Sequence, residues 1–463
     1  RIGARKGWEA VSSNGAAVLG SSRGIEAVFE FVKRDGTKIV FSAGNNKIFT
    51  GTSTLAAVTL PSGYSISANN WKIVSFNNDV YFFQRGHAAL VSVAGSTTLI
   101  AVADGGTAAP AANEVLAAYG RLWAADITAN KYVVYWSDLL DGDDWHGGSS
   151  GSLDLTLVWP TGFDEVVALS AHNGFLIIFG KKSMIVYSGA AAPASMTLSD
   201  TIEGIGCIAR DSVQHTGADI LFLSDTGVRS LGRTIQEKSL PLNDLSKNVR
   251  TDLTSLVPLQ TNAIKSLYSA DEAFYLLTLP DSDTTYCFDM RSPLQDGSQR
   301  ATTWSGLHPL AFTTTEAGDI YFGLSSGIVK YSGYLDGTAN YQMRYFSNPM
   351  DFGNASNLKF LKKFNITIIG GQNTNSTLNW GYDYSTNFTK QVFTLTGSVN
   401  AGEYGVSEYN TTAEYTATAI INTPKVNTSG SGEIVTIGIE TEINDTAFSI
   451  QKIDIHALLG RLI

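Results

Sequence analysis

One hairpin pattern recurs seven times in the first 335 residues of this chain, and it constrains the fold more than any other feature. Each copy has a turn of Gly, Asn or Asp, an apolar strand, a short polar turn and a second apolar strand, as in "HNGFLIIFGKKSMIVYSG" (172–189). Equivalent turn residues of successive copies lie between 41 and 54 residues apart, which is typical of a four-stranded propeller blade with its loops. The seven copies begin near Asp35, Asn77, Tyr119, His172, Thr216, Asp271 and Ala317.

The two strands of each hairpin are almost continuously apolar, as in FLIIF and MIVYSG. Such strands are expected to be buried on both faces, so each hairpin is predicted to form the central pair of a blade between two neighbours. We therefore predict an all-β fold, a β-propeller of six to eight blades with seven favoured, because closure can combine strands from both chain ends. The alternative is a β-sandwich of irregular hairpins, whose turns would recur about every 8–12 residues.

The composition changes after about Tyr334, where the chain becomes rich in Thr, Asn, Ser and Tyr. Segments such as "FLKKFNITIIGG" and "EIVTIGIETEI" alternate or run apolar between Gly and Asn turns, which indicates strands. We predict two domains. Residues 1–335 would form the propeller with an N-terminal segment, and residues 336–463 a β-sandwich-like domain.

One segment of the propeller region, residues 239–258, lacks β alternation and is predicted to form one short inserted helix. Either Asn243 or Asp244 is a candidate N-cap, because short polar side chains satisfy the free N–H groups of a helix start. The apolar residues with roughly helical spacing are Leu242, Leu245, Val249 and Leu253.

The charge of the chain argues against sequence-specific DNA binding. Only 16 % of the residues are charged, the net charge is −10, and no run of Lys or Arg forms a nucleic-acid footprint. An acidic wall that repels phosphate and lets DNA slide past remains compatible with this composition. The longest apolar runs fall far short of the roughly 20 residues that span a bilayer, so no membrane span is expected.

Three short motifs resemble catalytic or nucleotide-binding signatures, but their surroundings do not fit. "GLSSG" (Gly323–Gly327) and "GGSSG" (Gly147–Gly151) match G-x-S-x-G, which needs a strand before the Ser and a helix after it. The first is followed by a strand, which predicts a hairpin turn, and the second lies in a loop. "GIGCIA" (Gly204–Ala209) lacks the βαβ unit of a dinucleotide site.

Four aspartates are concentrated in "WSDLLDGDDW" (Trp136–Trp145), and carboxylates in a loop can bind calcium. An EF-hand is excluded because Ser152 stands where the last ligand, Glu, would be. We favour a blade-to-blade turn with Trp136 and Trp145 packed beneath it, and keep calcium as the lesser alternative. The four aspartates are Asp138, Asp141, Asp143 and Asp144.

No other residue set predicts a metal, cofactor or active site, so we expect a protein that is not an enzyme. Cys207 and Cys287 give no disulfide framework and no CxxC zinc motif. The six histidines are scattered, without HxH or HExxH spacing: His87, His146, His172, His215, His308 and His456. Seven N-x-S/T sequons are attributed mainly to the Asn- and Thr-rich composition: Asn354, Asn365, Asn375, Asn387, Asn410, Asn427 and Asn444.

Several stretches, in their order along the chain, resemble a family of bacteriophage tail proteins. "RKGWEAVS" (5–12) resembles its R-x-G-[FW] start, and "YWSDLLDGDDW" (135–145) its S-d-x-x-D-x-x-W segment. The hairpin block (164–189) and "IEGIGCIARDSVQHTGADILFLSDTGVRSLG" (202–232) resemble two further blocks, and the chain end (432–462) resembles its closing strand pair. The family is the tail nozzle or tail hub proteins of short-tailed phages, also called packaged-DNA stabilisation proteins.

This resemblance implies a structural virion protein, made in the host cytoplasm and located in the virion tail. Such proteins form a ring, commonly of six copies, below the portal and adaptor. The ring extends and closes the DNA channel, lets double-stranded DNA pass non-specifically, and mounts tail fibres or spikes. The resemblance carries over no catalytic, cofactor-binding or metal-binding residue.

Propellers host many functions, so the fold alone leaves a second reading open. The alternative is a propeller-based carbohydrate-binding or glycosidase-like protein. It predicts carboxylates and aromatic side chains converging on the mouth of the central channel, with Asp138 and Trp145 as candidates.

Overall fold

In the computed structural model, the chain divides into two compact units, which are described separately below. The first is Ala10–Lys330, and the second combines Arg1–Glu9 with Tyr331–Ile463. The structure describes residues 2–19, 24–64, 66, 70–104, 107–160, 162–237, 244–371, 374–395 and 421–462.

The second unit begins at Tyr331, five residues before the predicted start of the C-terminal domain at residue 336, and the first nine residues group with it. Backbone hydrogen bonds explain this grouping: Gly7 N–H donates to Gly333 O at 3.0 Å and Trp8 N–H donates to Leu335 O at 2.7 Å. The Arg5 guanidinium also forms a two-pronged ion pair with Asp336, at 2.7 and 2.6 Å. The N-terminal segment is thus paired with the stretch that follows the propeller.

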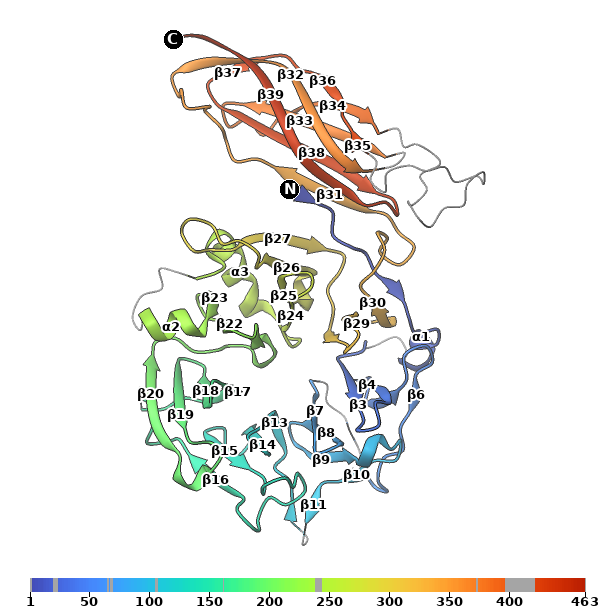
Figure 1. Cartoon of the computed structure of the whole chain (residues 1–463), viewed down its shortest axis with the longest axis vertical. Helices are drawn as coiled ribbons and strands as arrows, with labels where there is room; N and C mark the ends of the chain where they lie inside the picture. The colour runs from blue at the N-terminus through green and yellow to red at the C-terminus, as the bar shows by residue number, and fades with distance from the viewer. Residues whose placement is uncertain are drawn as a thin grey trace. The chain divides into compact units, whose positions relative to one another are not determined.

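Residues 10–330 form a seven-bladed β-propeller (Figure 1). The first four blades in chain order are the sheets β3–β6 (Ala27–Val32, Lys38–Gly44, Lys47–Thr50, Ala56–Ala57), β7–β10 (Lys72–Phe76, Asp79–Gln84, His87–Ser92, Ile100–Ala101), β13–β16 (Ala112–Ala118, Arg121–Ile127, Val133–Trp136, Gly151–Asp154) and β17–β20 (Val166–His172, Phe175–Gly180, Ser183–Ser188, Thr197–Glu203). The other three are β21–β23 (Gln214–His215, Ile220–Ser224, Gly227–Ser230), β24–β27 (Lys265–Ser269, Phe274–Leu279, Thr284–Asp289, Arg300–Ser305) and β28–β30 (Ala311–Thr314, Ile320–Leu324, Gly327–Lys330) joined by β2 (Glu9–Ala10).

Each of the seven repeated hairpins supplies the second and third strands of its blade, as predicted. Their side chains fill the spaces between blades, which explains why both faces of these strands are apolar. Phe41 of β4 meets Phe82 of β8 at a ring distance of 5.3 Å, and Phe179 of β18 meets Phe222 of β22 at 5.1 Å. The core is therefore a series of interblade layers.

The seventh blade takes its outer strand from the other end of the chain. The strand order is β2-β30-β29-β28, and the N–H groups of Val11 and Ser12 donate to Ile328 O at 3.0 and 3.1 Å. An unpaired edge of β30 would leave backbone donors and acceptors without partners. The N-terminal strand thus closes the propeller.

The predicted inserted helix is present as α3 (Arg250–Leu256), with Leu245 and Leu253 in one buried cluster and Val249 packed against it. The predicted cap is wrong for Asp244, because its buried carboxylate pairs with Arg250 and no side chain caps α3. Leu242 and Asn243 lie outside the described residues. Two further short helices, α1 (Gly15–Leu19) and α2 (Leu231–Glu237), were not predicted.

The C-terminal unit is a β-sandwich, as predicted. One sheet has the order β31 (Tyr341–Phe346), β38 (Val435–Ile443), β33 (Asn375–Tyr382) and β34 (Thr389–Thr394). The other contains β1 (Ile2–Gly3), β39 (Phe448–Leu462) and β32 (Asn357–Gly370), with β35 (Ile421–Asn422), β36 (Lys425–Asn427) and β37 (Ser431–Gly432) beside β32. Both sheets contribute to one buried core that includes Phe364, Ile366, Leu378, Trp380 and Ile439.

Among the described residues, no helix has the length and apolar character needed to cross a membrane.

Candidate functional site

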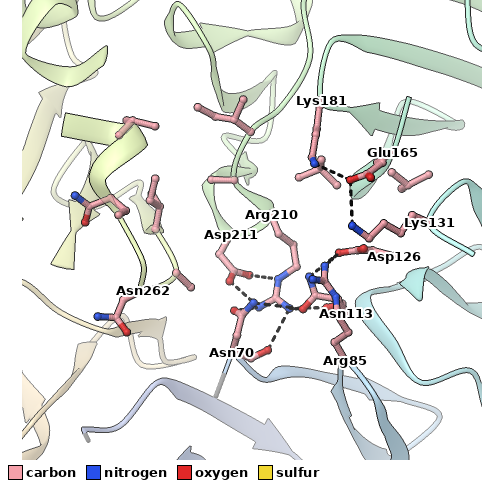
Figure 2. A pocket seen from close by; sticks show the side chains of 18 residues that line it. Asn70, Arg85, Asn113, Asp126, Lys131, Glu165, Lys181, Arg210, Asp211 and Asn262 are labelled. Carbon is pink, nitrogen blue, oxygen red and sulfur yellow. Dashed lines mark hydrogen bonds and ion pairs between the residues drawn. The ribbon is translucent and has the colours of Figure 1, made fainter. Parts of the chain in front are cut away.

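The clearest candidate site is a pocket of about 380 Å³ near the propeller axis, at the end where the innermost strands begin (Figure 2). Strands β7, β13, β17 and β24 are innermost in their blades and surround the axis in Figure 1. One wall is apolar and includes Val257, Ala263 and Ile264. The charged lining residues are Arg85, Asp126, Lys131, Glu165, Lys181, Arg210 and Asp211.

The buried Arg210 guanidinium is the centre of the site, and its side chain is only 4 % exposed. It pairs with Asp211 in two-pronged geometry, at 2.9 and 2.6 Å. It also donates to the side-chain oxygens of Asn70 at 2.8 Å and Asn113 at 3.1 Å, and to Trp71 O at 3.2 Å. Arg210 therefore joins residues of three blades through charge-assisted hydrogen bonds.

Two lysines and a glutamate surround this pair. Lys265 Nζ lies 2.7 Å from Asp211 Oδ2, and Lys72 Nζ lies 3.2 Å from Glu114 Oε2. Glu114, with a side chain 2 % exposed, also lies 3.8 Å from Arg210. Lys72, Glu114 and Lys265 lie at or near the first residues of β7, β13 and β24. The starts of these three inner strands therefore place charged side chains near the propeller axis.

Burial and ion pairing act in opposite directions on the pKa values of these groups. Burial raises the pKa of Glu114, because its nearby cations only partly offset the loss of water. Burial opposes ionisation of Asp211 as well, but Arg210 and Lys265 outweigh it and hold the pKa of that carboxyl well below its usual range. Asp211 is therefore the carboxylate that anchors the cations.

We expect Glu114→Gln to gain stability relative to the natural chain as the pH rises. A carboxyl whose folded pKa is raised contributes stability below its unfolded value of about 4.3, and that contribution is lost as pH rises through the folded pKa. Glutamine lacks this titration and still accepts the Leu169 N–H. The measurement is the unfolding midpoint of both proteins at pH 4 and pH 8, with the exposed Glu316→Gln as control. A midpoint difference that does not grow toward pH 8 would contradict the role given to Glu114.

The mouth of the pocket carries three partly exposed cations. Lys131 Nζ and Lys181 Nζ converge on one oxygen, Glu165 Oε2, at 3.3 and 2.6 Å, and Arg85 pairs with Asp126 (Figure 2). Lys181, chiefly by hydrogen bonding, and then Lys131 keep the pKa of Glu165 low. The mouth therefore holds ionised groups that are already arranged around an oxyanion.

The aspartate-rich segment does not form a calcium site among the described residues. Its carboxylates accept hydrogen bonds from the loop itself: Asp138 from Ser149 N–H at 2.8 Å, and Asp144 from Gly147 N–H at 2.7 Å. The loop joins β15 to β16 within one blade, so the predicted blade-to-blade turn is wrong. Trp136 and Trp145 are buried beneath it, as predicted.

Neither group proposed for the carbohydrate-binding alternative lines the axial pocket. Asp138 is held in the β15–β16 loop and Trp145 belongs to the core between the second and third blades. The pocket does present carboxylates, but each has a cation as its partner. Sequence reasoning therefore selected the wrong carboxylates for the axis.

The short motifs have structural roles. In "GLSSG", Leu324 pairs with Gly327 across the β29–β30 hairpin turn, as predicted. "GGSSG" ends the β15–β16 loop. "GIGCIA" lies between β20 and the inner end of the next blade, where Cys207 N–H donates to Gly180 O at 2.8 Å. Its glycine at 206 packs directly on the backbone of Lys181 and Lys182.

We expect Gly206→Ala to destabilise the propeller by about 1–3 kcal/mol, because the new methyl group would overlap that backbone and force it to move. Urea denaturation followed by tryptophan fluorescence measures the change. Gly232→Ala in α2 is the matched control, since its nearest neighbours are the side-chain atoms of Asp219, at 3.3 Å or more. Equal effects of the two substitutions would contradict the close approach at Gly206.

The histidines contact different partners. His215 bonds to Ser170 at 2.9 Å, His456 to Asn365 at 2.9 Å, and His308 pairs with Asp283 at 2.5 Å. No group of three possible metal ligands occurs in the part of the chain that the structure describes. Asn410 lies outside that part, and the other six sequons remain without a test of modification.

The residues that form the axial site were not found from the sequence. Arg210 and Asp211 appear in the "IARDSV" stretch, but only as part of a family resemblance. Asn113 and Asn70, which bond to Arg210, are 97 and 140 residues away from it in the sequence. A weak signal exists in the charged or amide residues at the starts of the inner strands, such as "NNWK" (69–72), "ANEV" (112–115) and "AIKS" (263–266).

No protein-family model matches the chain, and no curated protein sequence matches it either. Among solved structures, PorZ, a surface component of the type-IX secretion system of Porphyromonas gingivalis, aligns over 68 % of this chain with 11 % identity and a TM-score of 0.37. The alignment covers 36 % of the PorZ chain, so this chain spans about a third of it. BamB from Moraxella catarrhalis aligns over 66 % of this chain and 84 % of its own, with 10 % identity and a TM-score of 0.40.

Proposed function

We propose that this chain is a structural protein of a short-tailed bacteriophage that forms the ring-shaped nozzle or hub of the tail. In this proposal the ring, of six copies, sits below the portal and adaptor, extends and closes the DNA channel, and carries tail fibres or spikes. The chain has no catalytic role in this account, and its place is the virion tail.

The observation that carries the proposal is where the family-like sequence blocks lie. The block at 5–12 supplies the Arg5–Asp336 pair and the strand β2 that closes the propeller. The block at 202–232 supplies Arg210 and Asp211 at the axis, and the last block supplies β38 and β39 of the sandwich. These blocks supply contacts and strands that hold the propeller and the sandwich together. Such positions suit a family defined by a structural role.

The C-terminal sandwich also presents an apolar patch suited to contact between subunits. Phe360 on β32 lies directly opposite Leu458 on β39, so their side chains share one face of the sheet. Their exposed fractions are 37 % and 59 %. Adjacent exposed apolar side chains of this size favour a protein partner over water. We assign this patch to the contacts of the ring.

The test is negative-stain imaging of the purified chain, alone and mixed with the cognate portal–adaptor complex. Rings with a central hole, or a cap added below the adaptor, are the expected result. Leu458→Asp should weaken ring formation, while Leu157→Asp, at a propeller residue that is 98 % exposed, should not. A chain that stays monomeric and unbound in both samples would contradict the proposal, and a glycan-binding screen would then test the carbohydrate alternative.

A further inference from the structure

We propose that the axial pocket of the propeller binds a small molecule with an oxyanion group, a carboxylate or a phosphate, at its mouth. The ligand would be held by Lys131, Lys181 and Arg85. This proposal is independent of the role of the chain in a tail.

The geometry at the mouth is that of an oxyanion site occupied by the protein's own side chain. Two ammonium groups, from the segment before β15 and from the β18–β19 turn, point at the single oxygen Oε2 of Glu165. An ammonium group has three N–H donors, and each of these lysines donates one of them to Glu165. The side chains of Lys131 and Lys181 are 35 % and 55 % exposed and both line the pocket, so a ligand that enters it can reach their ammonium groups.

The charges that line the pocket leave room for one more negative charge. Its lining has four cations, Arg85, Lys131, Lys181 and Arg210, against the three carboxylates Asp126, Glu165 and Asp211. This local excess of cations occurs in a chain with a net charge of −10. Lys131 and Lys181 share the single carboxylate of Glu165, and a bound anion would give these two cations a second counter-charge.

Further charged groups lie behind the lining. Lys72 and Lys265 face Glu114 and Asp211. The carboxylate of Glu26 accepts the Asn70 N–H at 3.2 Å. The carboxylate of Asp164 accepts backbone N–H groups of the β18–β19 turn at 2.9 to 3.0 Å. Asp164 therefore lies beside Lys181 with its oxygens bonded to backbone, while the ammonium groups of Lys131 and Lys181 bond to Glu165.

The volume and the other lining residues of the pocket limit the ligand to a small molecule. The cavity measures about 380 Å³, near the lower end of small-molecule sites, which are roughly 300–1,000 Å³. Asn262, an uncharged residue, lies across the pocket from the lysines (Figure 2), and the apolar part of the lining includes Val257 and Ile264. A compact anion can therefore pair with the cations while its carbon atoms contact that wall.

The experiment is isothermal titration of the full chain with inorganic phosphate and, separately, with succinate, in low-chloride buffer. Saturable binding of one probe is expected, and the two arms distinguish a phosphate ligand from a carboxylate ligand. Binding should weaken as NaCl is added, since the contact is electrostatic. Absence of binding by both probes overturns the proposal.

Three variants locate the site. Lys131→Ala with Lys181→Ala should reduce affinity at least about tenfold, because two charge-assisted contacts are lost. Lys38→Ala with Lys247→Ala is the matched control, since these lysines are 41 % and 49 % exposed and also pair with carboxylates. Glu165→Gln should tighten binding about tenfold, since it removes the competing carboxylate. Unchanged affinity in the first variant, or weaker binding in the last, overturns the proposal.

Discussion

Replacing Arg210 with alanine is expected to destabilise the propeller by about 3–5 kcal/mol, the range found when one partner of a buried ion pair is removed. The substitution leaves Asp211 and Glu114 buried without their central cation, and it removes the hydrogen bonds to Asn70 and Asn113. Because these residues belong to different blades, the loss should lower the stability of the whole propeller. Urea denaturation at pH 7 measures the free energy of unfolding.

Arg291→Ala is the control for this prediction. Arg291 pairs with Asp289 at 2.8 Å, but its side chain is 70 % exposed, so a change below about 1 kcal/mol is expected. A cost for Arg210→Ala that is no larger than this control would mean that the axial network does not stabilise the propeller.

Trp123→Ala is expected to cost about 3–5 kcal/mol through the cavity left between the third and fourth blades. The Trp123 ring is fully buried, lies 5.6 Å from the Trp136 ring, and donates its Nε1–H to Ala118 O at 3.0 Å. Its cluster contains residues of β14, β15, β17 and β18, so the cavity would open an interblade layer. Thermal and urea unfolding measure the loss.

Two further variants test whether the stability loss of Trp123→Ala comes from lost packing. Trp123→Phe retains a large ring and should cost clearly less than the alanine variant. Leu157→Ala removes a side chain that is 98 % exposed and should leave stability unchanged. If Trp123→Ala behaved like Leu157→Ala, the interblade layers would not be the core of this fold.

The propeller was predictable because its main signal is local. Each hairpin carries its own turn residues and two apolar strands, so seven short patterns specify the second and third strands of the seven blades. These are central pairs except in the fifth blade, where β23 is an edge strand among the described residues. The edge strands are weaker signals: β6 and β10 have two residues each, and the fifth sheet has only three strands. Closure by β2 was a general expectation about chain ends, and the sequence around Glu9 does not indicate it.

The errors arise where distant segments decide the structure. The domain boundary depends on Gly7 and Trp8 bonding to residues more than 320 positions away. Asp244 looks like a helix cap in sequence, but burial beside Arg250 gives it an ion-pair partner instead. Helices α1 and α2, of five and seven residues, are too short for an apolar period to show.

The axial site depends even more on long-range contacts. Arg210 is the first residue of an ordinary "RDS" triplet, and nothing in that triplet points to Asn70 or Asn113. Only the closed ring of blades brings these residues together. The aspartate-rich loop is a case of local contacts. Its density of carboxylates left calcium binding open as the lesser alternative, and in the structure Asp138 and Asp144 accept N–H groups of the same loop.

The central claim is that this chain builds the nozzle of a short-tailed phage, and the most direct measurement is a mass. Mass photometry of the cognate portal–adaptor complex, with and without the chain, counts the copies bound. We predict a gain of six times the 49.6 kDa of one chain, in a single step and without intermediate species. A complex whose mass stays unchanged at saturating chain concentration would contradict the claim.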